Sequence, residues 1–393
     1  MDRFMSILAL VLQLLTTYTA VIAVFCFLPS KRPQAAPPTT RFAILIPARN
    51  EEAVIGNIVG CLRRQNYPKD KFRIFVIPNN CTDSTELAAR MAGAEILACR
   101  EPVASKGEVL HQVFAQLMGQ YDAYCIFDAD NLVHPDFLAR MNDAVAGGAL
   151  CAKGGQKASN PCESWVSGCY DIYFQTLATL YNRPRSVLGL SAMLVGTGFM
   201  VTEELLRRLG GWNTVTLTED MEFSAQCAAA GIRIHYVMEA VTFDEQPTSF
   251  RLSLRQRRRW SAGVLDTANR YIPKLLAKSP AWLRLDMIMT LVLVYVPFLS
   301  LFPAVYFLWK TAFSEVLWIP LLSLAGFWMG ASALAYILVL VSRKEPRKMW
   351  RSILLYPLFL ASWYPLNILA IFARPKQWQP ITHIGTHDVK NRG

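Results

Sequence analysis

Two carboxylates separated by a single residue, Asp128 and Asp130, directly follow the apolar run 123–127. A run of this kind is typical of a buried strand in a parallel sheet, and open α/β sheets bind ligands at the carboxyl ends of their strands. Neighbouring carboxylates repel each other and are costly to desolvate, so the pair indicates a hard divalent cation, which takes oxygen ligands and bridges to phosphates. The alternative is a loop in which the aspartates only cap the next helix.

A second acidic pair, Glu219 and Asp220, follows Thr218 and stands before an expected helix over 221–230. The positive end of a helix dipole stabilises acids at such a position. The pair is therefore either part of a site or a feature of the helix start alone.

The third polar cluster runs from Gln256 to Trp260 and contains three consecutive arginines, the last of which is Arg259. It lies in the segment 253–278, whose apolar residues then recur at helical spacing, and this pattern predicts a helix in the membrane interface. The arginines therefore either face an anionic ligand or form a juxtamembrane cluster on anionic lipid.

The elements that must position these clusters alternate between short strands and helices in the first half of the chain. Such alternation predicts an α/β fold with a doubly wound, mostly parallel sheet. The pattern is less regular over 135–254, and no G-x-G-x-x-G follows the first strand, which argues against a dinucleotide-binding fold. We expect strands over 42–46, 72–77, 94–98 and 123–127, and helices after Asn50, over 83–92 and over 105–118.

Apolar residues make up 53% of the chain and are concentrated at its two ends. Four uncharged stretches are long enough to span a bilayer. Since Lys31 and Arg32 follow the first stretch, we expect the chain after it to be cytoplasmic; a signal peptide would carry its positive charge first. The net charge of +11 gathers beside these stretches, which argues against nucleic-acid binding. The expected spans are 6–28, 287–309, 316–341 and 353–372.

Six regions follow from these patterns. They are an N-terminal transmembrane helix in 1–30, a linker at 31–40, a cytoplasmic domain at 41–254, a basic amphipathic interface helix at 255–280, transmembrane helices at 281–373 and a polar tail at 374–393. The tail and the loop 343–351 are both basic, although three full crossings would separate them. Because the last span contains Pro357 and Pro365, a broken or re-entrant segment with a cytoplasmic tail is the preferred arrangement.

The nine cysteines are scattered and show no C-x-x-C spacing. We therefore expect neither a disulfide framework nor a zinc site. None of the histidines has metal-ligand spacing either.

The three polar clusters occur in the order Asp-x-Asp, Thr-Glu-Asp and Gln-x-x-Arg-Trp, beside membrane spans. In this the chain resembles the membrane-integrated family 2 glycosyltransferases, which include cellulose synthase, hyaluronan synthase and chitin-type N-acetylglucosaminyltransferases. The resemblance covers residues 41–265 by motif. It implies a GT-A-type fold and an inverting transfer from a nucleotide sugar.

The resemblance also implies a role for each motif residue. Asp130 and Asp128 would hold Mg²⁺ or Mn²⁺ on the diphosphate of the donor, and Asp220 would be the general base. Trp260 would stack on the acceptor sugar. The expected donor-binding residues are Pro47, Arg49, Glu51, Asn79, Lys106, Asp128 and Arg259. The expected acceptor-binding residues are Gly196, Thr197, Gly198, Glu219, Gln256 and Trp260.

One position departs from the family. Relatives usually have an aspartate that pairs with uracil where this chain has Asn79. An amide both donates and accepts hydrogen bonds, so Asn79 still suits uracil but leaves another base open. The tail residues Trp378 and Thr382 weakly resemble a gating segment, and a disordered tail is the preferred interpretation.

We therefore expect an enzyme of the bacterial inner membrane that uses a UDP-sugar and extends a β-linked polysaccharide at the cytoplasmic face, possibly with translocation of the product. The alternative is the transfer of one sugar to a membrane lipid, as in ceramide glucosyltransferases. A third hypothesis is a non-catalytic membrane subunit, supported by Asn79 alone. Membrane lipids are expected partners and nucleic acid is not.

Overall fold

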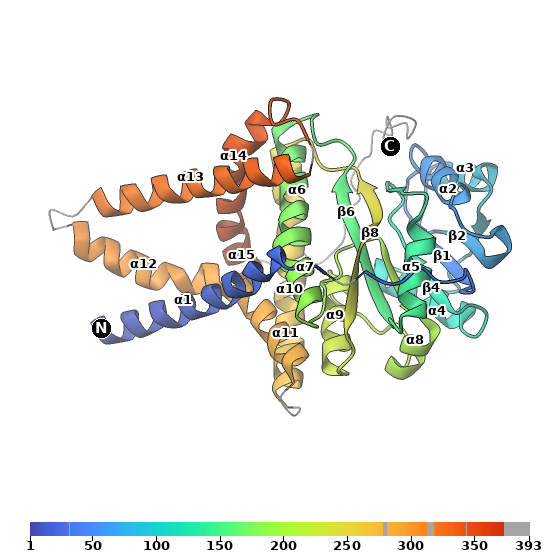
Figure 1. Cartoon of the computed structure of the whole chain (residues 1–393), viewed down its shortest axis with the longest axis horizontal. Coiled ribbons are helices and arrows are strands. Elements are labelled where there is room, and N and C mark those ends of the chain that lie inside the picture. Colours follow the sequence, from blue (N-terminus) through green and yellow to red (C-terminus); the bar gives the residue numbers. More distant parts are fainter. Residues whose placement is uncertain (31, 278–280, 313–317, 343, 373–393) are drawn as a thin grey trace.

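The computed structural model describes residues 1–30, 32–277, 281–312, 318–342 and 344–372. The predicted polar tail, with Trp378 and Thr382, lies outside these ranges. The described chain forms an α/β domain at one end and a group of long apolar helices at the other (Figure 1).

An eight-stranded sheet forms the centre of the domain, in the order β3-β2-β1-β4-β7-β6-β8-β5. Its first four strands pair in parallel, as predicted, whereas β7 is antiparallel to both β4 and β6, and β5 is antiparallel to β8. β8 returns to a parallel pairing with β6. The sheet is therefore doubly wound over its first half and mixed over its second. The strands are β1 Phe42–Ala48, β2 Phe72–Pro78, β3 Glu95–Ile96, β4 Ala123–Ile126, β5 Leu132–Val133, β6 Cys151–Ala158, β7 Phe199–Thr202 and β8 Ile234–Asp244.

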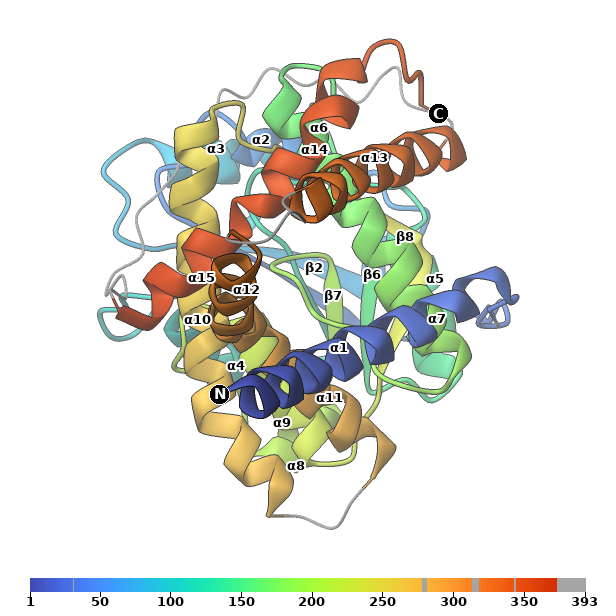
Figure 2. The ribbon, with the colours of Figure 1, turned by 90° about the vertical axis from the view of Figure 1, so that its left-hand side faces the viewer.

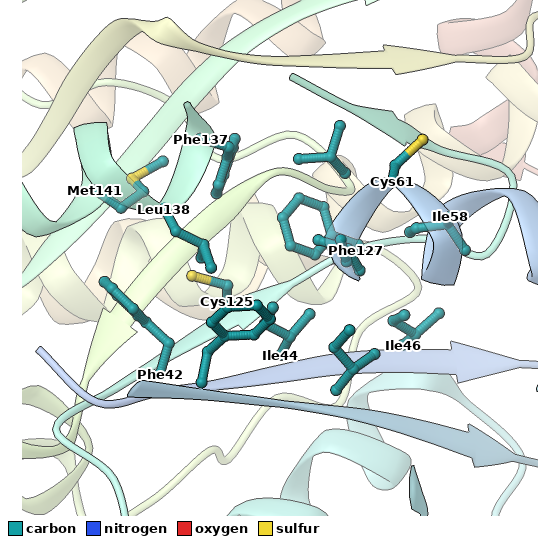
Figure 3. Close-up of a cluster of buried hydrophobic side chains, with 14 of the residues drawn as sticks. Phe42, Ile44, Ile46, Ile58, Cys61, Cys125, Phe127, Phe137, Leu138 and Met141 are labelled. Carbon is teal, nitrogen blue, oxygen red and sulfur yellow. The ribbon is translucent and has the colours of Figure 1, made fainter. Parts of the chain in front are cut away.

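Two hydrophobic cores cover the two faces of the sheet, because alternate residues of a strand point to opposite sides. In β1, Ile44 and Ile46 pack under α2, α3 and α5, whereas Ala43 and Leu45 pack under α4, α8 and α9. Figure 3 shows the first core, where side chains of β1 and β4 meet Ile58 of α2. The helices are α2 Ile55–Arg63, α3 Thr85–Ala92, α4 Lys106–Leu117, α5 Phe137–Ala146, α8 Glu203–Leu209 and α9 Glu219–Ala229.

Two long helices stand between the sheet domain and the apolar helices (Figure 1). α6 Trp165–Thr176 continues into a π-helical turn, η3 Leu177–Asn182, and then into α7 Arg183–Val187. α10 Phe250–Leu276 is the helix predicted for the membrane interface, and it packs against α9 on one side and α11 and α15 on the other. Because α10 begins at Phe250, the cluster from Gln256 to Trp260 lies well inside the helix.

Within the described residues, four helical segments are long and apolar enough to cross a membrane. They contain α1 Asp2–Val24 with η1 Phe25–Phe27, α11 Trp282–Val292 with η4 Leu293–Tyr295 and α12 Val296–Ala312, α13 Trp318–Val341, and the pair α14 Trp350–Ala361 and α15 Trp363–Phe372.

The fourth segment runs in a different direction from the other three. Figures 1 and 2 both show α14 and α15 lying across the direction of α1, α12 and α13, beside α6 and α10. A single turn residue, Ser362, separates the two helices, and the two prolines lie inside them, so the predicted broken or re-entrant arrangement stays a prediction.

Ion pairs mark the two ends of the apolar group. Lys344, just before α14, bonds to Asp171 of α6 at 2.6 Å, which ties this loop to the sheet domain. Lys310 and Asp2 meet at 3.0 Å and so bring the end of α12 to the start of α1. In Figure 1 the start of α1, marked N, and the far end of α12 lie away from the sheet.

Candidate active site

A cavity of about 590 Å³ lies at the carboxyl ends of β1, β2 and β4 and reaches the apolar helices. Every predicted site residue except Gly198 lines it. These lining residues are Pro47, Arg49, Glu51, Asn79, Lys106, Asp128, Asp130, Gly196, Thr197, Glu219, Asp220, Gln256, Arg259 and Trp260.

Lys106 forms the centre of the cavity's polar network. It begins α4, whose N-cap Ser105 accepts a hydrogen bond from the backbone N–H of Glu108. Its Nζ donates to Asp128 Oδ1 at 2.5 Å and to the carbonyl of Gly196 at 2.7 Å, and it lies 3.6 Å from Glu219. Burial opposes the charge on Lys106, but the neighbouring carboxylates outweigh it and raise the pKa of its ammonium. Lys106 therefore stays charged and joins three separate loops.

Asp130 lies close to two further carboxylates, those of Glu51 and Asp244. Burial, together with the charge of Asp130, raises the pKa of Glu51 to about 8. The same two causes raise the pKa of Asp244 to about 8. The buried Asn131 bridges these loops, since its Nδ2 donates to Asp130 at 3.3 Å and to Asp244 at 3.0 Å.

Asp244 is a site residue that our sequence reasoning missed. It ends β8 and also accepts a hydrogen bond from Gln156. The available signal was a strand ending in two acids, Asp244 and Glu245, which is the same pattern that drew attention to Asp128 and Asp130.

The side chains of the cavity suit a hard divalent cation. Among the described lining residues, seven carboxylates face three cations; the acids are Glu51, Asp128, Asp130, Glu219, Asp220, Asp244 and Glu245, and the bases are Arg49, Lys106 and Arg259. Within the described part of the chain, no group of three or more acids, histidines or cysteines forms a ready-made metal cage. In many proteins Mg²⁺ is held by one or two carboxylates together with the substrate phosphates.

Asp220 lies in the first turn of α9 with both carboxylate oxygens engaged. Oδ1 accepts from the backbone N–H of Met221 at 2.7 Å, and Oδ2 accepts from the N–H of Gly196. Burial raises the pKa of Asp220 above that of an exposed aspartate, although these two bonds oppose the shift. Burial likewise raises the pKa of the adjacent Glu219 to about 7.

The two glycines of the predicted acceptor loop have different surroundings. Gly196 lines the cavity with φ +56°, and its peptide groups hold Asp220 and Lys106 in place. Gly198 does not line the cavity: a Cβ there would approach Thr242 of β8 to 2.8 Å. Gly198 is glycine because its φ is +64° and Thr242 packs closely against it, and its predicted contact with the acceptor stays a prediction.

Thr197, between these glycines, fixes the loop through three hydrogen bonds. Its Oγ1 donates to Asn131 and accepts from the N–H of Asp128, and its carbonyl accepts from Lys153 at 2.8 Å. Lys153 is buried, and burial lowers its pKa to about 8 despite the neighbouring carboxylates. Sequence reasoning missed Lys153, whose only signal was a charge inside a strand of small residues.

The basic run on α10 divides between two faces of the helix. Arg259 lines the cavity, where burial lowers its pKa against the opposing charges of Glu219 and Asp128. The ring of Trp260 stacks on the ring of Trp363 in α15, with the two ring centroids 6.3 Å apart. Arg257 is fully buried away from the cavity, donates to the carbonyl of Phe359 at 2.9 Å and lies 4.0 Å from that ring.

The sheet end of the cavity is formed where β1 and β2 end. Asn79 lines it, and its backbone N–H donates to the carbonyl of Ala48 at 2.8 Å, which joins the two strand ends. Glu51 is fixed by a hydrogen bond from its backbone N–H to Thr85 Oγ1 at 2.8 Å. Gln256 of α10 also lines the cavity and accepts a hydrogen bond from the hydroxyl of Tyr170 at 2.9 Å.

Comparison with known proteins gives a family and a fold. The family described as Glycosyltransferase like family 2 matches residues 37–263, more than half of the chain. The structure of mannosyltransferase PcManGT from Pyrobaculum calidifontis, in complex with GDP-Man and Mn²⁺, matches with a TM-score of 0.63 at 18% identity. The match covers 93% of this chain and 99% of that one, so the two proteins share a fold over nearly their whole lengths.

Curated relatives match over the same domain. Probable glycosyltransferase YdaM of Bacillus subtilis is 28% identical over 235 residues, which are 57% of this chain and 55% of that protein. Beta-monoglucosyldiacylglycerol synthase of Synechocystis sp. is 28% identical over 239 residues, which are 58% of this chain and 48% of that protein. The chain therefore spans about half the length of the curated relatives it matches.

Proposed function

Because this chain belongs to the glycosyltransferase-like family 2 and has a GT-A-type fold, we propose that it transfers a sugar from a nucleotide sugar to a hydroxyl group carried by a membrane lipid. The observation that carries this proposal is the cavity itself. Its walls run without interruption from Asp130 and Lys106 to Leu293 and Trp363, which belong to the apolar helices. A soluble acceptor needs no such extension.

The donor end accommodates the nucleotide sugar. The nucleobase of the donor would lie against Pro47, Arg49, Glu51 and Asn79. Its diphosphate would face Lys106 and Arg259. We assign a UDP-sugar as donor; a guanine nucleotide, as bound by PcManGT, is the alternative that Asn79 leaves open.

Asp130 and Asp128 would hold Mg²⁺ or Mn²⁺. The bound ion would supply positive charge beside the departing diphosphate. Asp128 already bonds to Lys106, so this lysine would keep the Asp128 carboxylate ionised and oriented. Arg259 adds a second fixed positive charge at the same end, in a partly closed site where such charge acts strongly.

Asp220 is the proposed general base. Its two backbone hydrogen bonds fix the carboxylate toward the cavity, where it would accept the proton of the acceptor hydroxyl. A single base on the face opposite the leaving group gives inversion at the sugar carbon. Glu219, Gln256 and Trp260 lie beside it and would contact the acceptor.

A lipid acceptor is preferred over the polysaccharide that the motifs suggested. Only α1, α12 and α13 run away from the sheet domain among the described helices, and α14–α15 lies across them (Figure 2). This leaves few helices to enclose a polymer channel. Two relatives at 28% identity are named beta-monoglucosyldiacylglycerol synthases, which are enzymes that make a glycolipid. The stacked Trp260 and Trp363 favour a polysaccharide as the second candidate, because aromatic faces also bind sugar rings.

The proposed location is the bacterial inner membrane with the catalytic domain in the cytoplasm. Lys344, which follows α13, lies next to this domain in its ion pair with Asp171, and basic residues beside a membrane span favour the cytoplasmic side. In intact cells, a maleimide reagent that cannot cross membranes should label an Asp2→Cys variant but not the exposed native Cys162. Labelling of Cys162 in intact cells would contradict this orientation.

The transfer itself is tested with the purified full chain in lipid micelles. A panel of nucleotide sugars with Mn²⁺ should identify one donor from which nucleotide is released and a single sugar appears on a lipid. A long polymer would instead establish the polysaccharide candidate. Absence of donor turnover and donor binding across the panel would support a non-catalytic subunit.

A further inference from the structure

The membrane end of the cavity is bounded by two irregular helical turns. Leu177 and Tyr181 belong to the π-helical turn η3, and Leu293 and Val294 belong to the 3₁₀ turn η4, which interrupts the apolar segment 282–310. All four side chains line the cavity. Irregular backbone at membrane depth is tolerated mainly where it lines a cavity, and π-helical turns occur frequently at functional sites. Two such turns at one cavity end indicate a formed binding site.

A buried polar network joins η3 and α7 to α11, the helix that leads into η4. The guanidinium of Arg185 makes two hydrogen bonds of 2.9 Å to Asp286 and lies 3.5 Å over the ring of Tyr181. Thr290 donates to the carbonyl of Asp286, so the Tyr181 hydroxyl donates to Thr290 at 2.7 Å. Tyr18 of α1 also donates to Asp286 at 3.0 Å. The network therefore fixes the walls of the site and leaves the Tyr181 oxygen able to accept a hydrogen bond.

The charge of this end of the cavity selects its ligand. Arg49, Lys106 and Arg259 are the cations among the described lining residues, and all three belong to the donor end. Arg259 faces Glu219, Asp128 and Asp220. Arg185 does not line the cavity and is already paired with Asp286. An anion between η3 and η4 would thus be buried without a partner, which costs several kcal/mol, on the order of a thousandfold in affinity.

We propose that the site between η3 and η4 binds the uncharged head of a lipid that carries a free hydroxyl, and that it rejects phosphate-bearing lipid acceptors. Leu177, Leu293 and Val294 would contact the first carbons of the lipid chains. Tyr181 would accept a hydrogen bond from the head group. The inference rests on the proposed function, because it specifies the acceptor of the same reaction.

The first experiment compares acceptors. The purified full chain, with the donor that supports nucleotide release, is given mixed micelles containing dioleoylglycerol, a ceramide or undecaprenyl phosphate at equal mole fraction. We expect at least one neutral lipid to accelerate nucleotide release at least tenfold more than undecaprenyl phosphate does. Equal or greater acceleration by the phosphate, or none by either neutral lipid, would overturn the inference.

The second experiment fills the site between η3 and η4 with a larger side chain. Leu293→Trp should raise the KM for the neutral lipid at least tenfold, and slow donor hydrolysis without acceptor is measured beside it as a check of folding. The matched control is Val305→Trp, at an exposed position on α12 outside the cavity, which should alter neither. Tyr181→Phe keeps the ring over Arg185 and should raise the lipid KM about three- to tenfold.

These outcomes distinguish failure of the proposed acceptor site from failure of the proposed glycosyltransferase activity. An unchanged lipid KM in both cavity variants, with hydrolysis retained, would overturn the acceptor site and leave the glycosyltransferase assignment standing. Loss of hydrolysis in Leu293→Trp alone would indicate misfolding, and Tyr181→Phe then decides. If the wild-type chain neither binds nor turns over any nucleotide sugar, the proposed function itself fails.

Discussion

Replacing Asp220 by asparagine tests the catalytic base and its setting together. The two oxygens of Asp220 accept hydrogen bonds from the backbone N–H groups of Gly196 and Met221. Asparagine has one acceptor oxygen, so in either orientation its NH₂ group faces a backbone N–H. The substitution therefore removes a base and also leaves a donor without a partner.

The two effects have different sizes and different readouts. Loss of a general base lowers the rate by about 100- to 10,000-fold, or about 3–5 kcal/mol in the activation free energy. A buried N–H without an acceptor costs about 1–3 kcal/mol of folding stability. We therefore expect kcat to fall by at least about 100-fold, with a modestly lower melting temperature and an unchanged Kd for the nucleotide sugar.

The assay measures nucleotide release with saturating lipid acceptor, together with thermal unfolding and donor binding. Asp70→Asn is the matched control, because Asp70 is exposed and lies outside the cavity, and it should behave as the wild type. An Asp220→Asn enzyme that keeps more than a tenth of the wild-type kcat would refute the assignment of the base.

The pH dependence of the same reaction gives an independent check. Burial raises the pKa of Asp220, so its carboxyl group takes up a proton at a higher pH than an exposed aspartate does. A base works only in its ionised form. Transfer should therefore decline as the pH falls through this raised pKa, and the decline should be absent from the residual activity of Asp220→Asn.

Three further predictions concern Arg257, Asp130 and Lys106. Arg257→Lys should lower stability by about 1.5–3 kcal/mol in thermal unfolding, because a lysine cannot keep both the carbonyl bond and the ring contact at Phe359; Arg255→Lys, at an exposed position on the same helix, should not. Asp130→Asn should raise the Mn²⁺ concentration for half-maximal transfer at least about tenfold, and an unchanged Mn²⁺ requirement would contradict its role. Lys106→Met should raise the KM for the nucleotide sugar at least about tenfold, measured by initial rates, since the diphosphate loses a fixed positive charge.

The sequence by itself determined the family, the α/β class and most of the candidate site. These follow from short-range patterns: apolar runs that end in acids, capping residues before helices, and uncharged stretches long enough for a bilayer. Strand geometry assigned Asp128 to a ligand-binding edge, and the resemblance to the family added Glu51 and Asn79 before any coordinates were known; all three line one cavity.

Tertiary structure decided which members of a motif reach that cavity. Arg257 and Arg259 are two positions apart, and since each residue of a helix turns about 100°, they point to nearly opposite sides. Only the packing of α10 shows which side faces the site. In the same way, Gly196 reaches the cavity and Gly198 packs against Thr242, although both belong to one small-residue turn.

The direction of the fourth apolar segment and the membrane end of the cavity were also decided by tertiary structure. Hydropathy measures length and composition, which are the same for a helix that crosses a bilayer and for one that lies against α6 and α10. The π-helical turn at Leu177–Asn182, which packs against α1 of the distant N-terminus, was not predicted from the sequence. Local chemistry thus fixed the elements and the acids at their ends, and long-range packing fixed what those acids face.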